Sequence, residues 1–383
     1  MTTTFSNPEA VMRHALELAR KGIGAVEPNP PVGAVVVDDG LRLLGEGYHQ
    51  QCGGPHAEVH ALRDAGEAAR GAQLFVTLEP CNHHGQTPPC CDAILQADLS
   101  RVVVATIDPA SHERVSGIAR LEQSGIEVIS GLLADEAQAL IASFTKLVTT
   151  GRPFVHVKWA MSLDGKIATS RGDSKWISGE ESRAHAHRLR GRMDAIIVGI
   201  GTALADDPEL TARPPGPRAA SRIVLDSQAR LPLESKLVTT ARETPVIVFS
   251  GPDASNDRIK HLESAGVEVV QTSVCEAKTL DWIAILDELG RRLMTNVLVE
   301  GGSGVLGSCL DARMADWAHI FVAPKILGGK ESLSPVGGAG AFKIADALHV
   351  EPVDFLKLGI DLFIEGRIIP STDRNVTDPQ LKL

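Results

Sequence analysis

The chain has 383 residues, more than one hydrophobic core usually organises, so we expect two domains. It is 43% hydrophobic and 22% charged, with a formal net charge of -10 and a sequence pI near 5.7. This acidic balance disfavours binding to long nucleic acids or anionic membranes. No apolar segment has spanning length and no export signal is recognisable, so we expect a cytoplasmic protein without membrane partners. The six cysteines are scattered, and two stand in a His-rich loop, which favours metal binding over disulfides.

The first part of the chain alternates helix-period and strand-period segments. We expect, in chain order, a helix over 8–21, a hairpin over 32–49 that turns at Asp38-Asp39-Gly40, a helix over 56–66, a strand over 72–80, a helix over 89–99, a strand over 100–109, a helix over 117–125, a strand over 126–133 and one helix over 134–151. This β-α-β-α alternation indicates a three-layer α/β/α domain.

A second α/β pattern follows the linker candidate Thr150-Gly151-Arg152-Pro153. Strands are expected over 153–162, 194–204, 222–227, 244–250, 266–273, 296–302 and 319–328, and a helix capped near Ser178 over 176–192. The second strand is expected to lead into a glycine-containing turn, and His185 and His187 to face solvent. We therefore divide the chain into domains over 1–149 and 153–367 and a polar tail over 368–383.

Three residues at element boundaries form a candidate zinc site. His56 opens the helix that follows Gly53-Gly54-Pro55, Cys81 follows a strand, and Cys90 stands at the start of the next helix. One imidazole and two thiolates suit tetrahedral zinc and leave a fourth position open for water. Glu58, two residues after the ligand histidine, can take the proton of that water and deliver it to a leaving amine. This is the layout of zinc nucleobase deaminases.

Other residues near this set have competing interpretations. A histidine at a helix start and two buried cysteines are separately common, but their order and placement together favour the catalytic zinc. Cys91 and Cys52 are alternative thiols, and we expect Cys91 to belong to the core, since neighbouring helical residues diverge by about 100°. With three ligands in place, His49, His83 and His84 are expected to line the substrate pocket. The eight residues between Cys81 and Cys90 exceed the usual deaminase spacing of two.

The sequence resembles the bifunctional riboflavin-biosynthesis deaminase–reductase family over about residues 9–367. The resemblance is carried by PNPPVGAVVV, GGPHAEVHAL, TLEPCNHHGQTPPC, KWAMSLDGKIAT, SKWISG and LADDPELTAR. The eight-residue cysteine spacing is typical of this family. The resemblance implies a cytidine-deaminase-like domain followed by a dihydrofolate-reductase-like domain, with Zn²⁺ and NADPH as cofactors. It also implies a homo-oligomer that assembles through the reductase domain.

In the first domain, the resemblance implies that Asn29, His49 and His83 contact the substrate. The sequence departs from the family at two places. Members usually have Lys or Arg at the position of Gln86, near the substrate phosphate, and Asp-Pro-Asn-Pro where this chain has Asp108-Pro109-Ala110-Ser111. We expect Arg114, or another nearby base, to compensate.

In the second domain, Gly302, Ser303, Gly304 and Gly307 form a G-x-G-x-x-G pattern after a strand, which by itself is a weak signal. A glycine-rich turn at a helix start presents N–H groups to phosphate, and the resemblance implies that it contacts NADPH. Carried over in the same way, the cofactor contacts are Lys158, Ala160, Trp176, Thr202, Asp206 and Ser227, and the substrate contacts are Ser174, Arg190, Leu210, Arg213 and Glu300. Lys158 has a competing interpretation as the solvent face of a strand.

The resemblance implies two successive reactions. The first is hydrolytic deamination of 2,5-diamino-6-(5-phosphoribosylamino)pyrimidin-4(3H)-one, and the second is NADPH reduction of the ribosyl chain of the resulting 5-amino-6-(5-phosphoribosylamino)uracil to ribityl. Two alternatives stay open at this point. One is a reductase-only enzyme with a structural zinc domain, and the other is a nucleic-acid base deaminase, which the acidic composition disfavours.

Overall fold

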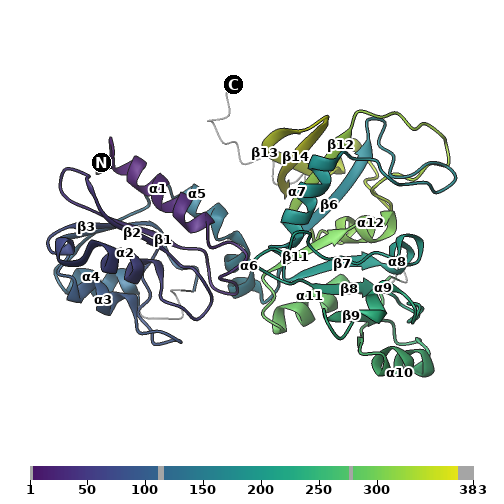
Figure 1. Cartoon of the computed structure of the whole chain (residues 1–383), viewed down its shortest axis with the longest axis horizontal. Coiled ribbons are helices and arrows are strands. Elements are labelled where there is room, and N and C mark those ends of the chain that lie inside the picture. The colour runs from purple at the N-terminus through teal and green to yellow at the C-terminus, as the bar shows by residue number, and fades with distance from the viewer. Residues whose placement is uncertain (1–2, 111–115, 276–278, 370–383) are drawn as a thin grey trace. The chain divides into compact units, whose positions relative to one another are not determined.

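A computed structural model describes residues 3–110, 116–275 and 279–369 of the chain. The chain divides into two compact units, Met1–Arg152 and Pro153–Leu383 (Figure 1). Each unit is an α/β structure built around its own sheet. Among the described residues, no helix combines the length and apolar character needed to cross a lipid bilayer.

The first unit is a five-stranded sheet in the order β2-β1-β3-β4-β5. Only β1 runs antiparallel to its two neighbours, β2 and β3. Its elements are α1 (Pro8–Arg20), β1 (Gly33–Val37), β2 (Leu43–Tyr48), α2 (Ala57–Ala65), a 3₁₀ turn (Gly66–Ala69), β3 (Gln73–Leu78), α3 (Cys90–Gln96), β4 (Arg101–Thr106), α4 (Gly117–Gln123), β5 (Glu127–Ser130), α5 (Ala134–Leu140) and α6 (Ala142–Thr150).

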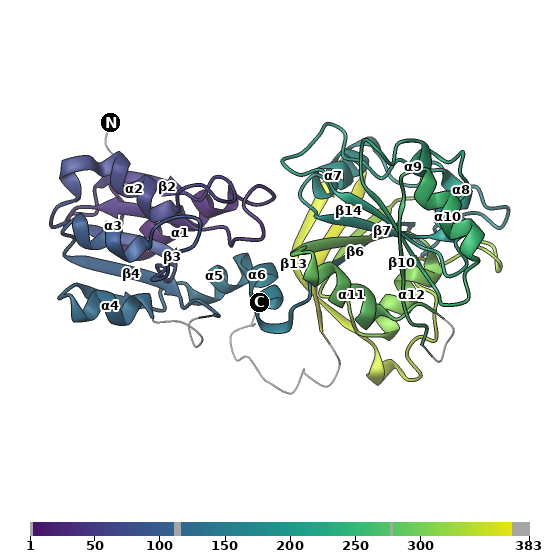
Figure 2. The same ribbon diagram turned by 90° about the horizontal axis from the view of Figure 1, so that it is seen from below.

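Helices cover both faces of this sheet, because alternate residues of its central strands point to opposite sides. Ala34, Val76 and Val104 pack with α2, α3 and α4 on one face, while Val35 and Phe75 pack with α1 and α5 on the other. Figure 2 shows α2, α3 and α4 gathered beside the strands. The three-layer α/β/α prediction is confirmed.

The single helix expected over 134–151 is instead two helices. The break lies at Ile141, whose φ of -99° and ψ of 13° leave the helical region. Its side chain is 2% exposed and belongs to the core that α2 and α3 share with the sheet. Burial of Ile141 therefore outweighs the continuous helical pattern, and α6 becomes a separate element that leads to the unit boundary.

The second unit is a nine-stranded sheet in the order β10-β9-β8-β7-β11-β6-β12-β14-β13. Its elements are β6 (Phe154–Ser162), α7 (Glu180–Arg190), β7 (Ala195–Gly199), α8 (Ile200–Asp206), β8 (Ser221–Leu225), α9 (Lys236–Thr239), β9 (Val246–Ser250), α10 (Asn256–Ser264), β10 (Glu268–Gln271), α11 (Trp282–Arg291), β11 (Asn296–Glu300), α12 (Ser303–Asp311), β12 (Trp317–Ala323), a 3₁₀ turn (Ile344–Asp346), β13 (His349–Leu358) and β14 (Asp361–Ile369).

Two helical layers enclose this sheet. One face packs against α11 and α12, and the other packs against α8, α9 and α10. Helix α7 covers the region of β12 and β14 through Ala186, Phe321 and Phe363. The strands from β10 to β12 are parallel, so their carboxyl ends meet at one edge, where α/β proteins place their ligands.

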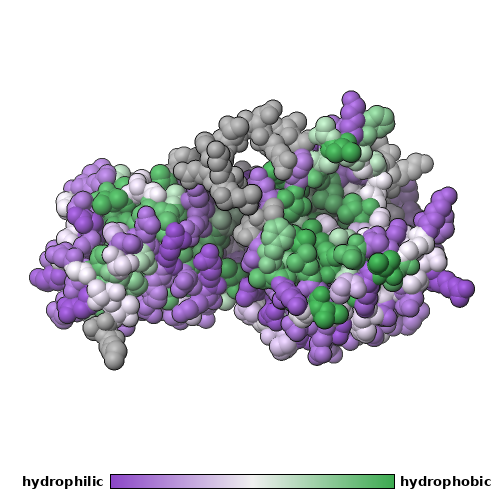
Figure 3. Space-filling model, turned by 90° about the horizontal axis from the view of Figure 1, so that it is seen from above, coloured by the Kyte–Doolittle hydropathy of each residue, from purple (hydrophilic) through white to green (hydrophobic). Residues whose placement is uncertain are grey.

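The C-terminal hairpin of β13 and β14 was not expected from the sequence. Pro352 and a register shift interrupt β13, so its period is hard to recognise. Large apolar side chains remain exposed on this hairpin, among them Phe355 (59%) and Leu362 (43%). Apolar side chains gather on one face of the second unit in Figure 3. The expected tail begins too early, because residues 368 and 369 belong to β14, and 370–383 lie outside the described residues.

Three local expectations around α7 and α8 are wrong. The N-cap of α7 is Gly179, and the buried carboxylate of Asp361 accepts its backbone N–H at 2.6 Å in place of a side-chain cap from Ser178. The turn expected after β7 is the helix α8. His185 and His187 are half-buried, because the His185 ring lies 4.5 Å from Phe363 and His187 Nδ1 contacts the backbone of the loop beyond α8.

Candidate active sites

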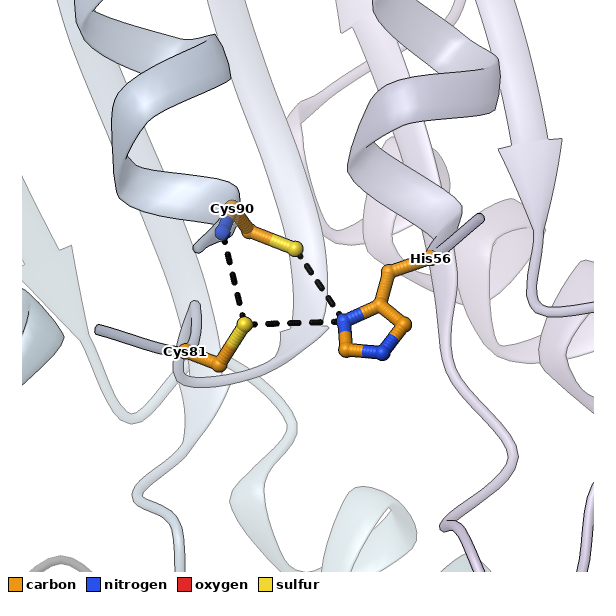
Figure 4. Close-up of side chains that lie close together, drawn as sticks. All are labelled: His56, Cys81 and Cys90. Carbon is orange, nitrogen blue, oxygen red and sulfur yellow. Dashed lines mark hydrogen bonds between the residues drawn. The ribbon is translucent and has the colours of Figure 1, made fainter. Parts of the chain in front are cut away.

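His56, Cys81 and Cys90 converge in the first unit (Figure 4). His56 is the N-cap of α2, Cys81 follows β3, and Cys90 is the first residue of α3. His56 Nδ1 lies 3.2 Å from Cys90 Sγ and 3.5 Å from Cys81 Sγ. The three ligand atoms lie within 4.8 Å of one another. One nitrogen and two sulfurs at this separation can share a tetrahedral metal ion.

The local electrostatics favour a thiolate at Cys81. Hydrogen bonding from the Cys90 side chain, with further help from His56, lowers the pKa of Cys81 to about 4. The backbone N–H of Cys90 also donates to Cys81 Sγ at 3.3 Å. The same shared hydrogen bond raises the pKa of Cys90, and the bond to Cys81 raises that of His56. A positively charged group among them would satisfy both sulfurs.

Glu58 lies in the first turn of α2 and is 3% exposed. Burial raises its pKa to about 7. Among the described residues, nothing hydrogen-bonds its buried Oε2 atom. A buried carboxylate oxygen without a partner is costly, so its place beside a histidine and two thiols fits a site that receives a metal-bound water. The residues present therefore fit zinc.

A cavity of about 330 Å³ opens onto these residues, and we call it the first-unit cavity. Its lining is Asn29, Pro30, Val32, His49, Gly53, Gly54, His56, Glu58, Leu78, Glu79, Cys81, His83, Gly85, Gln86, Thr87, Asp108, Phe144 and Val148. The cavity therefore brings together two of the three expected metal ligands, His56 and Cys81, with the expected proton carrier and all three expected substrate contacts.

Asn29 and His49 form a fixed pair in the cavity. His49 Nδ1 lies 3.0 Å from the carbonyl oxygen of Pro55, which can only accept, so Nδ1 carries the proton. His49 Nε2 then accepts from the Asn29 side-chain amide at 3.1 Å. Burial lowers the pKa of His49, which favours this neutral form. The Asn29 carbonyl oxygen is thereby oriented as an acceptor.

The two departures from the family pattern fall at the cavity. Gln86 lines it, and its Oε1 lies over Gly53, where an added Cβ would meet it at 2.5 Å. The backbone N–H of Ala110 donates to Asp108 Oδ1 at 2.9 Å, and Asp108 also lines the cavity. Ser111 and Arg114 lie outside the described residues.

In the second unit, Arg190 and Glu300 form a bidentate ion pair. Arg190 Nε and Nη2 donate to the two carboxylate oxygens of Glu300 at 2.8 and 2.6 Å. The side chains are 17% and 7% exposed. Burial alone would raise the pKa of Glu300, but the charge of Arg190 outweighs this and lowers the pKa to about 2. Both residues were expected to hold substrate, and the structure places them against each other.

Lys158 lies beside this ion pair. It is the register partner of Glu300 between β6 and β11, and its Nζ lies 5.6 Å from the ring centroid of Phe321. Burial lowers the pKa of Lys158, which the Arg190 charge reinforces and the Glu300 charge opposes. Its burial argues against the interpretation as a solvent-facing residue.

The loop before α7 holds Trp176 at the surface. The Trp176 ring is 65% exposed and stacks with the Arg183 guanidinium at 4.8 Å. Lys325 Nζ donates to the Trp176 carbonyl oxygen at 2.6 Å. Ser174 lies half-buried in the same loop. An exposed aromatic ring held by a cation offers a flat surface that a ligand can cover.

The glycine-rich segment joins β11 to α12. Gly302, with φ of 79°, is the N-cap, and Ser303 begins the helix. A Cβ on Gly302 would lie 3.0 Å from Thr202 Oγ1, so α8 approaches this turn closely. Gly304 faces open space, whereas a Cβ on Gly307 would lie 2.3 Å from the Gly337 backbone. Gly307 is therefore needed for the close packing of α12 against the Gly337 backbone. This agrees with the expectation that the glycine pattern by itself is only a weak signal for a cofactor site.

The remaining expected contacts are spread over strands, helices and loops of the second unit. Leu210 is buried, and Arg213 pairs with Glu209 while its backbone N–H meets His187 Nδ1 at 3.3 Å. Asp206 lies 3.8 Å from Lys175 Nζ, in reach of the Trp176 loop. Ala160 packs near Phe321. Ser227 follows β8, and its carbonyl oxygen accepts from Gly251.

Asp108, Phe144 and Val148 are among the residues that line the first-unit cavity and that the sequence did not identify as site residues. Asp108 was noted only as part of a motif. Phe144 and Val148 are four residues apart, a spacing that reads equally well as core packing of a helix. Asp361 was also missed, because the hairpin that carries it was not recognised.

Two family models match the chain. The cytidine and deoxycytidylate deaminase zinc-binding region matches residues 5–106, and the RibD C-terminal domain matches residues 153–364. The chain is 43% identical over 354 residues to the riboflavin biosynthesis protein RibD of Aquifex aeolicus (strain VF5), covering 92% of this chain and 96% of that protein. It is 40% identical over 360 residues to RibD of Actinobacillus pleuropneumoniae, covering 94% of each.

Solved structures are similar over the same extent. A diaminohydroxyphosphoribosylaminopyrimidine deaminase/5-amino-6-(5-phosphoribosylamino)uracil reductase from Thermotoga maritima has a TM-score of 0.81 and 38% identity, covering 94% of this chain and 98% of that chain. One crystal form of Acinetobacter baumannii RibD has a TM-score of 0.81 and 36% identity over the same shares. Both domains and their order are therefore common to this chain and these proteins.

Proposed function

The chain belongs to the RibD family, the bifunctional deaminase–reductases of riboflavin biosynthesis, and we propose from this premise which residues carry each reaction. The first unit removes the 2-amino group of 2,5-diamino-6-(5-phosphoribosylamino)pyrimidin-4(3H)-one. The second reduces the ribosyl chain of the product, 5-amino-6-(5-phosphoribosylamino)uracil, to ribityl with NADPH. The deaminase domain corresponds to the unit that ends at Arg152, and the reductase domain begins at Pro153 and includes β14, which ends at Ile369.

The buried, unpartnered Oε2 of Glu58 is the observation that carries the deaminase assignment. His56, Cys81 and Cys90 hold zinc, which when bound supplies an acidified water at the open position. Glu58 would take the two protons of that water in turn, passing one to the ring nitrogen next to C2 and the other to the leaving amino nitrogen, so that ammonia departs as the C2 carbonyl forms. Its buried place in the first turn of α2, two residues after His56, suits this role.

Asn29, His49 and His83 orient the pyrimidine. The Asn29 amide nitrogen is engaged by His49, so its carbonyl oxygen accepts from ring N–H or amino groups of the substrate. His49 cannot rotate freely, because its other nitrogen is bonded to the Pro55 carbonyl. Such a preformed pair holds the reacting carbon in place, which is the main contribution that positioning makes to rate.

In the second unit, Glu300 contacts the substrate, and Lys158 contacts the cofactor beside the hydride-transfer site. Bound NADPH supplies the hydride, and the chain positions both partners. The other contacts of the chain with the cofactor are Ala160, Trp176, Thr202, Asp206, Ser227, Gly302, Ser303 and Gly304, whereas Gly307 lets α12 pack closely against the Gly337 backbone. The phosphate side of the substrate is held by Ser174, Leu210, Arg213 and Arg190. Because Arg190 also pairs with Glu300, the phosphate contacts are joined to the residue that contacts the rest of the substrate.

A two-arm assay tests the proposal. The purified protein is incubated with the diaminopyrimidine nucleotide, and ammonia and NADPH absorbance are followed with and without NADPH. Ammonia release without NADPH is expected, followed by NADPH oxidation when the cofactor is added. NADPH oxidation confined to pre-deaminated substrate would contradict the deaminase assignment. The reductase-only alternative is not favoured, because the deaminase model matches and the ligand set is complete.

We further propose a cytoplasmic homo-oligomer that assembles through the reductase domain. The exposed Phe355 and Leu362 of the C-terminal hairpin support an association surface there, since exposed apolar patches mark protein contacts. Light scattering of the full chain, compared with a Phe355→Ser variant, tests this. An unchanged mass in the variant would place the contact elsewhere.

A further inference from the structure

Helix α6 contributes two apolar side chains to the first-unit cavity. Phe144 and Val148 stand four residues apart and therefore lie on one face of the helix. Val148 is 41% exposed, whereas Leu147, on the neighbouring face, is 8% exposed. Phe144 and Val148 line the cavity and Leu147 does not, so the Phe144–Val148 face is the one directed at the cavity.

The rest of the lining has a different character. Asn29, His49, Glu58 and Asp108 supply amide, imidazole and carboxylate groups. A ligand that fits this cavity has polar groups around its edge and an apolar face that packs against α6. A planar aminopyrimidine has this form, because its nitrogen and oxygen atoms lie in the ring plane and its faces are apolar.

We propose that Phe144 and Val148 are substrate-contacting residues that set the ring specificity of the deaminase. This inference rests on the proposed function and names residues that neither the metal site nor the family motifs include. Phe144 packs on the pyrimidine, and Val148 packs on the part of the substrate nearest the cavity mouth. Covering both removes apolar surface from water, which strengthens binding of the ring.

The position of α6 in the chain gives this contact a second consequence. The helix ends at Thr150, Gly151 follows with φ of 71°, and the second unit begins at Pro153. A substrate seated on α6 therefore stabilises the helix that adjoins the linker.

Steady-state kinetics of the full chain test the contact. Phe144→Ala should raise the deaminase KM by about tenfold and Val148→Ala by about threefold, with kcat nearly unchanged, because a binding contact is lost and not a catalytic group. Phe144→Leu should lie between the wild type and Phe144→Ala. Thr149→Ala is the matched control, since Thr149 is exposed on the same helix and is not among the lining residues.

Hydrogen exchange separates substrate contact from a purely structural role. In the Glu58→Gln variant, which should bind substrate without turning it over, adding the diaminopyrimidine nucleotide should slow amide exchange in α6. Phe144→Ala in that background should abolish the slowing while zinc content and NADPH oxidation on pre-deaminated substrate stay unchanged. If Phe144→Ala folds poorly, the exchange of the Glu58→Gln variant alone decides.

The outcomes distinguish this inference from the proposed function. If the wild type releases no ammonia, the deaminase assignment fails. If the wild type deaminates and either the KM of Phe144→Ala is unchanged or substrate leaves exchange in α6 unaltered, the α6 inference is overturned and the deaminase assignment stands.

Discussion

The two units differ in how their polar groups are paired before any ion or cofactor binds. In the first unit, three metal ligands from two helix starts and one strand end lie within 4.8 Å of one another, around a cavity with one orphaned carboxylate oxygen. In the second, the ionisable groups Arg190 and Glu300 already satisfy each other, and the other expected contacts are spread over separate strands, helices and loops. The deaminase site is completed by an ion, and the reductase site by a large cofactor. Removing a metal ligand, or acidifying the medium, should therefore affect the two units differently.

The largest effect should come from Cys90→Ser. Zinc content should fall close to zero and ammonia release should become undetectable, because a hydroxyl is a poor substitute for a thiolate ligand. NADPH oxidation on pre-deaminated substrate should persist. Metal analysis alongside both assays checks this. Cys91→Ser is the control, since the Cys91 thiol contacts the carbonyl oxygens of Pro80 and Gly117, and loss of zinc there would contradict the ligand assignment.

Glu58→Gln should lower the deaminase kcat by about 10³-fold, in the range that a positioned acid–base group contributes. Zinc should stay bound, because Glu58 is not among the three ligands, and the reductase should work normally on pre-deaminated substrate. Ammonia release and metal content measured on the same preparation check this. Loss of zinc in the variant would make Glu58 a ligand and not the proton carrier.

Acid should destabilise the second unit through Glu300. Its pKa falls from 4.5 to about 2 on folding, so its contribution to stability is complete above pH 4.5 and is lost as the pH falls toward 2. The full contribution is on the order of 3 kcal/mol. Between pH 5 and pH 3, Glu300→Gln should therefore lose less unfolding free energy than the wild type, as followed by denaturant titration.

Glu268 provides the matched control for the acid experiment. Its pKa is also lowered, by hydrogen bonding to Arg292, but its side chain is 52% exposed. Solvent screens such pairs, so Glu268→Gln should follow the wild-type pH dependence closely. If the two substitutions changed the pH dependence of the unfolding free energy equally, burial of the Arg190–Glu300 pair would not be the cause of the acid sensitivity.

The smallest expected effects are those of alanine substitutions at two glycines of α12, Gly304 and Gly307. Gly304→Ala meets open space, so the fold should be unaffected, while the added methyl at the helix start should raise the KM for NADPH about threefold. Gly307→Ala would press on the Gly337 backbone and should lower the melting temperature instead. Thermal unfolding and NADPH titration of both variants check the contrast. An unchanged KM in Gly304→Ala would remove it from the cofactor contacts.

The sequence was most informative where chemistry and chain position coincide. That His56, Cys81 and Cys90 lie together could be predicted, and Glu58 proposed beside them, because their residue types and their places at or next to helix starts point to one reaction. The pairing of Arg190 with Glu300 could not, because the two are 110 residues apart and each alone suits a phosphate or a polar substrate. Ile141 and Phe144 show a further limit, since a helical pattern does not reveal which apolar side chains enter the core and which enter a cavity.

The carboxylate of Asp361 gives the reductase unit a particular order of assembly. It accepts from the Gly179 backbone and from the Ser182 hydroxyl, both at 2.6 Å, across more than half of the unit. During synthesis the deaminase unit is complete once residue 152 has been added, and such domains fold first. The start of α7 therefore lacks this acceptor until the first residue of β14, the last described strand, has left the ribosome. A message truncated shortly before Asp361 would therefore yield a chain that deaminates but does not reduce.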